Sequence, residues 1–217
     1  MISQILKENV EEYYYRVKDT NPLFVNARNG KLTEKNVSSY LNNVLYLIRH
    51  TPVYLSYAQG KARERKMEPL AVFFGSKLRE EDGHDKWAMN DLEHLKEKFG
   101  VTPQKDLSPH ILELVDFLKV TIEKDPNLYV AYIFLAEYFT ILLGPSWLND
   151  LETQCGIPKS MMTVIGNHAE LDKEHVKEDI IQMDALLVKV KKPELFVSVL
   201  QKAIQLHENF CKEVGKV

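Results

Sequence analysis

The stretch Leu128-Tyr-Val-Ala-Tyr-Ile-Phe-Leu-Ala-Glu137-Tyr-Phe-Thr-Ile-Leu-Leu143 decides the fold of this 217-residue chain. It carries a single charge, so a helix formed here is apolar on every side. Such a helix is surrounded by other elements, and the stretch therefore predicts the central helix of the core. A carboxylate in that place is costly unless it is paired, hydrogen-bonded, protonated or bound to a metal ion. Glu137 is accordingly a metal-binding or catalytic group, or else a neutral acid bonded to a tyrosine or an arginine.

The remaining segments repeat apolar residues at helical spacing, and no stretch alternates convincingly as a strand does. Ser108-Pro109 is typical of a helix start and Gly100 of a helix end. The predicted helices cover about residues 2–18, 33–65 with a kink at Pro52, 69–98, 109–124, 126–145 with a further piece at 147–153, 159–188 and 193–214. Asn21-Pro22 and Asn29-Gly30 predict a loop after the first helix. No linker or repeat divides the sequence, so we expect one all-α domain over residues 1–217.

The composition is that of an ordinary globular protein, with 45% hydrophobic residues, 27% charged residues and a net charge of −3. This balance gives no reason to expect nucleic acid or an anionic membrane surface as a partner. We expect no apolar run of membrane-spanning length, and the N-terminus has no signal-peptide pattern. Cys155 and Cys211 lie far apart and are typical of reduced thiols, which predicts a cytoplasmic protein.

A second informative stretch is His168-Ala-Glu-Leu-Asp172-Lys-Glu-His175. Seven residues make almost two turns of α-helix, so the two imidazoles share a face and Asp172 lies on that face between them. Two imidazoles and a carboxylate suit a transition metal of the iron, manganese or zinc kind. The alternative is a solvated helix face, because charged residues surround the stretch.

The third predicted helix carries Glu81-Asp-Gly83-His84-Asp-Lys-Trp87. Glu81 and His84 are three residues apart, and such an ExxH pair presents one carboxylate and one imidazole to a metal in helix-bundle di-iron proteins. The pattern also arises by chance in a chain with 31 acidic residues. Gly83 inside a helix costs about 1 kcal/mol relative to alanine. That cost suggests a close approach by another backbone or a ligand, with a surface glycine as the equal alternative.

Three predicted helices thus supply six candidate metal ligands: Glu81, His84, Glu137, His168, Asp172 and His175. On these motifs the chain resembles the heme-oxygenase-like di-iron oxidases and oxygenases, which share a seven-helix fold with heme oxygenase and with the TenA and PqqC proteins. The resemblance covers essentially the whole length. It implies a single-domain seven-helix bundle whose ligands come from the third, fifth and sixth helices.

The same resemblance implies an Fe(II) cofactor, with two ions per chain, and O2 as co-substrate. The expected substrate is a small organic acid or amine, oxidised by N-oxygenation or oxidative C–C cleavage. No catalytic residue beyond the metal ligands is expected, and Glu137 is the best candidate for a bridging ligand because it lies on the most buried helix. A homodimer is the default expectation for an enzyme of this size.

Lys77 departs from the family pattern, since some members have a carboxylate seven residues before the third-helix histidine. Glu80 or Glu81 could supply the missing oxygen ligand, because both lie within one turn of His84. If neither reaches, the chain binds one metal ion, binds metal weakly, or is no oxygenase. Lys77 could instead contact a substrate carboxylate. Weaker substrate-binding candidates are Arg49, His50, Tyr132 and Tyr138.

Three rival functions remain open at this stage. The first is a heme-oxygenase-like binding or regulatory protein without redox activity, in which a salt bridge of Lys77 takes the place of metal. The second is a TenA-like thiaminase or hydrolase, which needs a nucleophile such as Cys155 in a pocket. The third is a PqqC-like oxidase that lacks metal.

Overall fold

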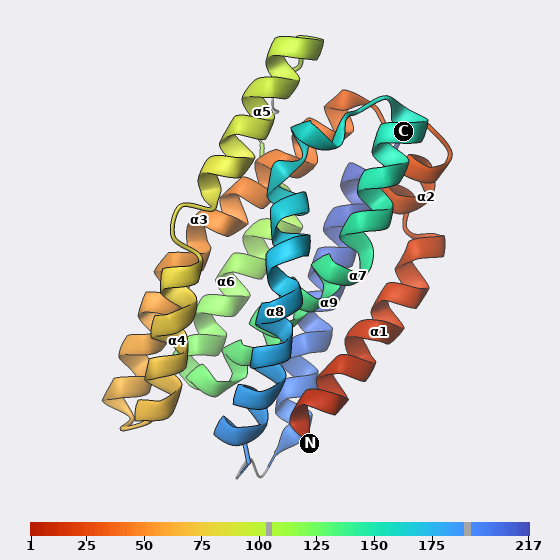
Figure 1. Ribbon diagram of the computed structural model, residues 1–217. Helices are drawn as coiled ribbons and strands as arrows, with labels where there is room; N and C mark the ends of the chain where they lie inside the picture. The colour runs from red at the N-terminus through yellow and green to blue at the C-terminus, as the bar shows by residue number, and fades with distance from the viewer. Residues whose placement is uncertain (103–105, 189–191) are drawn as a thin grey trace.

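The computed structural model describes residues 1–102, 106–188 and 192–217, and every regular element in these ranges is helical. The short 3-10 turns η1 (Pro126–Leu128) and η2 (Lys159–Met161) precede α7 and α8. The α-helices are α1 (Ile2–Thr20), α2 (Pro22–Arg28), α3 (Glu34–Glu64), α4 (Glu68–Glu80), α5 (Asp85–Phe99), α6 (Pro109–Lys124), α7 (Tyr129–Cys155), α8 (Thr163–Leu186) and α9 (Pro193–Val214). The predicted all-α fold class is confirmed. Figure 1 shows α8 across the front of the bundle, with α4 and α5 on one side and α1 on the other.

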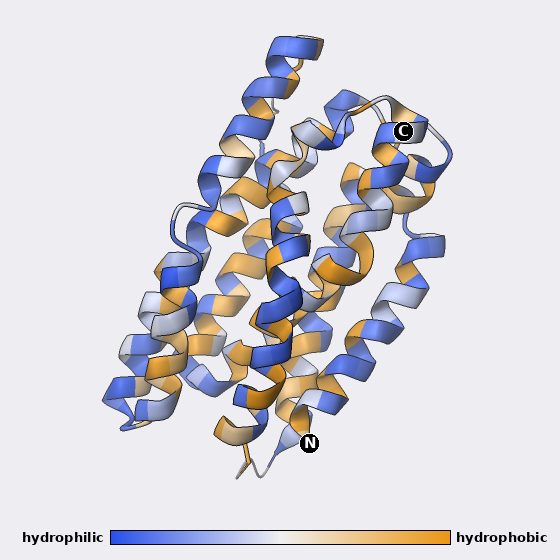
Figure 2. Cartoon of the chain, viewed as in Figure 1, coloured by the Kyte–Doolittle hydropathy of each residue, from blue (hydrophilic) through white to orange (hydrophobic). Residues whose placement is uncertain are grey.

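The central helix is α7, as the sequence predicts. It packs against α8, α1, α2 and α9, and thirteen of its residues are buried. Figure 2 shows how the hydrophobic residues of the surrounding helices face the interior of the bundle while the hydrophilic ones face outward. Glu137 is the only acidic or basic residue among the buried residues of α7. The helix continues through Pro145 to Cys155, and Gly156, with a φ of 69°, ends it in the left-handed conformation.

The expectation that no apolar run is long enough to span a membrane was wrong. The segment Pro126–Cys155 is long enough and apolar enough to cross a membrane, by length and composition alone. Most of its most apolar window, 61%, is buried inside the bundle. Burial by other helices explains the apolar composition of this segment, because a core helix has no solvated face.

The predicted loop after α1 contains the short helix α2. The Asn21 side chain accepts a hydrogen bond from the Leu23 N–H at 3.1 Å, and Pro22 occupies the first helical position. Asn-Pro therefore acts here as a helix start, in which a side-chain cap and a fixed φ favour the first turn. The C-terminal helices begin close to the predicted residues, since Ser108 caps α6 and Pro193 opens α9.

The third predicted helix is divided into α4 and α5 by the non-helical residues 81–84. Gly83 has a φ of 83°, a left-handed conformation that an L side chain rarely adopts. A Cβ added at Gly83 would meet only the end of the Lys86 side chain, at 3.6 Å, so backbone conformation rather than a close approach requires the glycine. Together with α2, this division explains why nine α-helices stand in the described ranges where the sequence predicts seven.

Candidate metal centre

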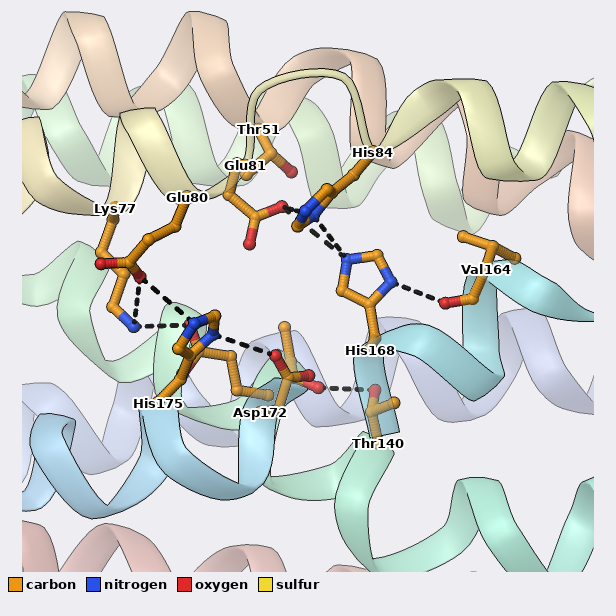
Figure 3. A network of polar contacts seen from close by, with 12 residues as sticks. Thr51, Lys77, Glu80, Glu81, His84, Thr140, Val164, His168, Asp172 and His175 are labelled. Atoms are coloured by element: carbon orange, nitrogen blue, oxygen red, sulfur yellow. Dashed lines mark hydrogen bonds and ion pairs between the residues drawn. The ribbon is translucent and has the colours of Figure 1, made fainter. Parts of the chain in front are cut away.

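The first potential metal-binding group consists of Glu81, His84 and His168. Their ligand atoms all lie within 4.8 Å of one another. The Glu81 Oε2 atom is 3.2 Å from His84 Nδ1 and 3.8 Å from His168 Nε2. Figure 3 shows the three side chains turned toward one another, two from the turn between α4 and α5 and one from α8. Two imidazoles and one carboxylate form a donor set that fits a ferrous ion.

The break at Gly83 is what builds this group. On a continuous helix Glu81 and His84 would lie side by side on one face, which is how the sequence predicts them. In the structure Glu81 is the C-cap residue of α4 and His84 is the N-cap residue of α5, so each side chain leaves a separate helix end. The Trp87 ring stacks on His84, with ring centroids 4.2 Å apart, and meets the His168 ring edge-on at 5.4 Å. The indole therefore fixes both imidazole planes.

The tautomer of His168 is fixed by its own helix. His168 Nδ1 is 2.7 Å from the Val164 carbonyl oxygen and donates its proton there. In the neutral ring Nε2 then carries the lone pair and faces Glu81 and His84, as a metal-binding imidazole requires. The start of α8 is held in turn by buried Asp91 of α5, which accepts hydrogen bonds from Thr163 Oγ1 at 2.7 Å and from the Val164 N–H at 2.8 Å.

The surroundings of the Glu81 carboxylate favour its ionised form. Burial alone would raise the pKa of Glu81, but hydrogen bonds and charge interactions with His168 and His84 lower it to about 2. Burial alone would likewise lower the pKa of His168, whereas Glu81 and the Val164 carbonyl raise it. An anionic oxygen between two imidazoles gives this group a net attraction for a cation.

The second potential metal-binding group consists of Glu137, Asp172 and His175, and its ligand atoms also lie within 4.8 Å of one another. We call it the acidic group. His175 Nδ1 is 3.4 Å from Asp172 Oδ1, and Glu137 Oε2 is buried without a hydrogen-bond partner. An orphaned buried carboxylate oxygen is costly, and a metal ion is one of the partners that would relieve the cost. Glu137 therefore meets His175, but the pair belongs to a different group from His84.

Lys77 points into the acidic group, and its side chain is only 6% exposed. Its Nζ atom lies 2.9 Å from Asp179 Oδ1, 3.0 Å from Glu137 Oε1 and 3.3 Å from Glu80 Oε2. Figure 3 shows Lys77 and Glu80 beside His175, on the side of the acidic group away from His168. An ammonium group has three protons, and these three carboxylates match that number. Lys77 therefore has no proton left for a substrate carboxylate, which argues against the substrate-binding role predicted for it.

Burial and charge act in opposition on these groups. Burial lowers the pKa of Lys77, but Glu137, Asp179 and Glu80 outweigh it and hold the pKa above its ordinary value. Burial, reinforced by Asp179, raises the pKa of Glu137. Burial is also the main reason that the pKa of Asp172 is raised to about 7.

A cavity of about 170 Å³ adjoins both groups. Charged side chains line one part of its wall, which we call the charged wall: Lys77, Glu81, Glu137, His168 and Asp172. The rest is mainly apolar or aromatic and includes Tyr40, Tyr132, Phe139 and His207. The cavity thus lies beside the candidate ligands, and it is large enough for a small organic molecule.

The structure brings one of the four weaker substrate-binding candidates to this cavity. Tyr132 lines it. Tyr138 instead donates a hydrogen bond from its hydroxyl to Glu11 of α1 at 2.7 Å, and Arg49 lies 3.5 Å from Asp85 with about half of its side chain exposed. His50 pairs through Nδ1 with the Tyr46 carbonyl oxygen at 2.8 Å. These three do not line the cavity, because side-chain direction on a helix depends on which face packs inward.

Sequence reasoning missed Asp179 and Asp91 and left the role of Glu80 undecided. Asp179 lies seven residues after Asp172, the same interval that separates the two histidines of α8, and that spacing could have identified it. Glu80 could not be distinguished from Glu81 while the two were placed on one continuous helix. Asp91 carries no spacing signal, since its partners come from the start of a distant helix.

Cys155, the nucleophile that a TenA-like enzyme would need, lies at the C-terminal end of α7. Its Sγ atom is 3.4 Å from the Ala27 carbonyl oxygen and the residue does not line the cavity. Burial raises the pKa of this thiol. A protonated thiol away from the cavity is a poor nucleophile for a molecule bound there.

Comparison with solved structures identifies the fold. A domain of unknown function with a heme oxygenase-like fold from Shewanella denitrificans superposes with a TM-score of 0.81 at 16% identity, covering 97% of this chain and 90% of that one. A TenA homolog from Pseudomonas syringae pv. tomato gives 0.69 at 16% identity, covering 97% and 91%. A CADD-like protein of unknown function from Nostoc punctiforme gives 0.66 at 11% identity, covering 96% of each chain. In sequence comparisons, neither a protein-family model nor a curated protein matches the chain.

The chain therefore has the heme-oxygenase-like fold, as its motifs predict. The solved structures that it resembles include a TenA homolog and a CADD-like protein, which agrees with the predicted relationship at the level of the fold. Within that fold it carries two carboxylate–imidazole groups that could hold metal ions.

Proposed function

We propose that this protein is a non-heme iron enzyme that uses O2 to oxidise a small organic acid or amine, by N-oxygenation or oxidative C–C cleavage. The observation that carries the proposal is the first group, in which Glu81, His84 and His168 converge with ligand atoms within 4.8 Å of one another. A 2-His-1-carboxylate set with open positions is typical of O2-activating ferrous centres. Three features support the proposal: the ligand atoms of the first group are of the kind that ferrous iron binds, the Val164 carbonyl selects the tautomer of neutral His168, and a cavity adjoins the group.

Each residue of the first group has a definable task. Glu81 and the two imidazoles would hold the iron, which supplies electrons for the reduction of O2 when bound. Val164 holds the Nδ1 proton of His168, so that Nε2 is the nitrogen available to a metal ion, and Trp87 limits rotation of both rings. The apolar wall of the cavity would exclude bulk water and place a C–H or N–H bond of the substrate beside the first group.

A second ion, as two irons per chain would require, must use Glu137, Asp172 and His175. That position adjoins the Lys77 ammonium, which already bonds to Glu137 Oε1 at 3.0 Å. Iron-dependent O2 chemistry does not depend on a second ion, because a mononuclear facial triad supports it. The proposal therefore rests on the first group.

The experiment is anaerobic loading with Fe(II), desalting, metal analysis and then exposure to O2. The wild-type chain should retain iron and consume O2. His168→Ala should lower iron affinity at least ~100-fold, since it removes one of three ligands. His94→Ala, at an exposed histidine of α5, is the matched control and should behave like wild type. Iron retention unchanged in His168→Ala, or no retention by either protein, would overturn the proposal.

The rival with a specific observation in its favour is a binding protein without redox activity. Lys77 does form the kind of buried salt bridge that this rival expects, with Glu137, Asp179 and Glu80. The rival predicts that a ligand enters the cavity equally well with and without iron. Ligand binding measured on metal-loaded and chelator-treated protein separates the two functions.

A further inference from the structure

The first group and the acidic group differ in the kind of nitrogen atom that lies next to their carboxylates. In the first group the neighbours of Glu81 Oε2 are two imidazole nitrogens, at 3.2 and 3.8 Å. In the acidic group the nearest nitrogen to Glu137 is the Lys77 ammonium, at 3.0 Å. Imidazole nitrogens are metal ligands, whereas an ammonium has no lone pair and cannot be one.

We propose that the chain holds one resident metal ion, at Glu81, His84 and His168, and that the Lys77 ammonium is the built-in cation of the acidic group. This inference rests on the proposed function for the nature of the first site, but it concerns a different site. It replaces the expectation of two irons per chain with one iron and one lysine.

The position of Lys77 supports the assignment. Its side chain leaves α4, is almost fully buried, and ends among carboxylates from α4, α7 and α8. Each N–O distance, from 2.9 to 3.3 Å, is that of a direct ion pair. A lysine that only filled space would have no reason to gather three acids from three helices, because each acid loses solvation on burial.

Repulsion between cations would exclude a metal ion from the acidic group while Lys77 is present. A divalent ion bound by Glu137, Asp172 and His175 would share Glu137 with the ammonium and would lie within a few ångströms of it. Like charges at that separation, shielded from water, repel strongly. Lys77 cannot easily leave, because its stem lies in the core and departure would strand Glu137 and Asp179 without a counter-ion.

The test is a titration with Co(II), an O2-stable probe, followed by calorimetry and metal analysis of the full chain. Wild type should bind one Co(II) per chain. Lys77→Met, which keeps the length and removes the charge, should bind a second ion, with affinity for the acidic group raised at least ~100-fold. Lys77→Glu should bind the second ion more tightly still. Lys61→Met is the matched control, because Lys61 also pairs with two glutamates but lies away from the cavity, and it should stay at one ion.

A thermal melt keeps the test decisive if Lys77→Met folds poorly. Without metal this variant should melt below wild type, and Co(II) should raise its melting temperature by more than it raises that of wild type. Adding Glu137→Gln to Lys77→Met should abolish the second ion and leave the first.

The outcomes separate this inference from the proposed function. Two ions in wild type, one of them lost in Glu137→Gln, would overturn the inference and leave an iron enzyme standing. One ion in both wild type and Lys77→Met would also overturn the inference. No ion in wild type and one in Lys77→Met would support the role of Lys77 and remove the first group as a metal site.

Discussion

Buried ionisable groups gather on two parts of the cavity wall, and the two parts differ in whether opposite charges offset the effect of burial. Burial still raises the pKa values of Glu137 and Asp172 on the charged wall. On the charged wall, Glu81 keeps its charge because two imidazoles face it, and Lys77 keeps its charge because three carboxylates face it. On the aromatic wall, which we define as Tyr40, Phe139 and His207, burial outweighs the charges of the described neighbours, including Glu208 beside His207. Burial there lowers the pKa of His207 to about 4 and raises the pKa of Tyr40.

This difference between the charged wall and the aromatic wall indicates which part of the cavity is suited to metal chemistry. Desolvation alone makes a group neutral, so the aromatic wall is suited to packing and to contact with an uncharged part of a substrate. Desolvation combined with opposite charges holds ions in fixed places, which is the condition for binding a metal. Substitutions on the two walls should therefore affect different properties.

The largest expected effect is on stability, from Phe139→Ala on the aromatic wall. The Phe139 ring stacks on Tyr13 with centroids 4.6 Å apart and meets His207 at 5.4 Å. Its removal should lower the free energy of unfolding by about 3–4 kcal/mol, because the core loses an aromatic side chain and gains empty volume. Urea denaturation measures this loss.

Phe139→Ala should lower stability without changing metal binding. Cobalt affinity of the folded variant should match wild type, since the described ring contacts of Phe139 are with Tyr13, Phe24 and His207, which belong to neither metal-binding group. A tenfold or greater fall in that affinity would show that the two walls are coupled and would break the comparison. Phe139→Leu is the matched control and should lose less stability, because it retains more of the side-chain volume.

The charged wall was the more predictable of the two. Glu137 stood out as the only charge in an apolar run, and the spacing of His168, Asp172 and His175 placed all three on one face of α8. Neither inference needed tertiary information, because helical periodicity converts sequence interval into direction. The seven predicted helices followed from the same periodicity.

The unpredicted features depend on the backbone or on distant contacts. The left-handed conformation at Gly83 places Glu81 and His84 at two separate helix ends, and no periodic pattern reveals a single residue of that kind. The contact of Tyr13 with His207 joins residues 194 apart, at opposite ends of the chain. A lysine at a helix edge is usually solvated, so only the packing of α4 against α8 shows that Lys77 turns inward.

The next largest effect should come from Asp91→Ala, which tests how the charged wall is held. Asp91 is fully buried and accepts hydrogen bonds from Thr163 and from the Val164 N–H. Its removal leaves both donors without a partner at the start of α8 and should cost about 2–3 kcal/mol of unfolding free energy. His168 lies one turn further along, so cobalt affinity should also fall about tenfold.

Glu113→Ala is the control for Asp91→Ala. Glu113 pairs with Lys202 at the surface, with more than half of its side chain exposed, and surface pairs contribute about 0–1 kcal/mol. It should leave cobalt affinity unchanged. If Asp91→Ala lost stability and kept full cobalt affinity, the start of α8 would not position His168.

The smallest expected effect is a change in pH dependence from His207, on the aromatic wall. Burial lowers the pKa of folded His207 to about 4, while the unfolded residue has its ordinary pKa of about 6.5. Between these values the unfolded chain takes up a proton that the folded chain does not, so stability should fall as the pH drops from about 6.5 to about 4. The loss should be on the order of 2 kcal/mol, and below pH 4 it should cease to grow because both states are protonated.

The measurement is urea denaturation at half-unit steps from pH 7 to pH 4, on wild type and His207→Asn. The asparagine amide can keep a contact with the Tyr13 hydroxyl, which is 2.8 Å from His207 Nδ1, but it does not titrate. The variant should therefore show a flatter profile even if its stability at pH 7 is lower. His110→Asn, at the start of α6 and away from the cavity, should retain the wild-type slope. An unchanged slope in His207→Asn would mean that His207 is charged when folded, and the aromatic wall would then differ from the charged wall only in degree.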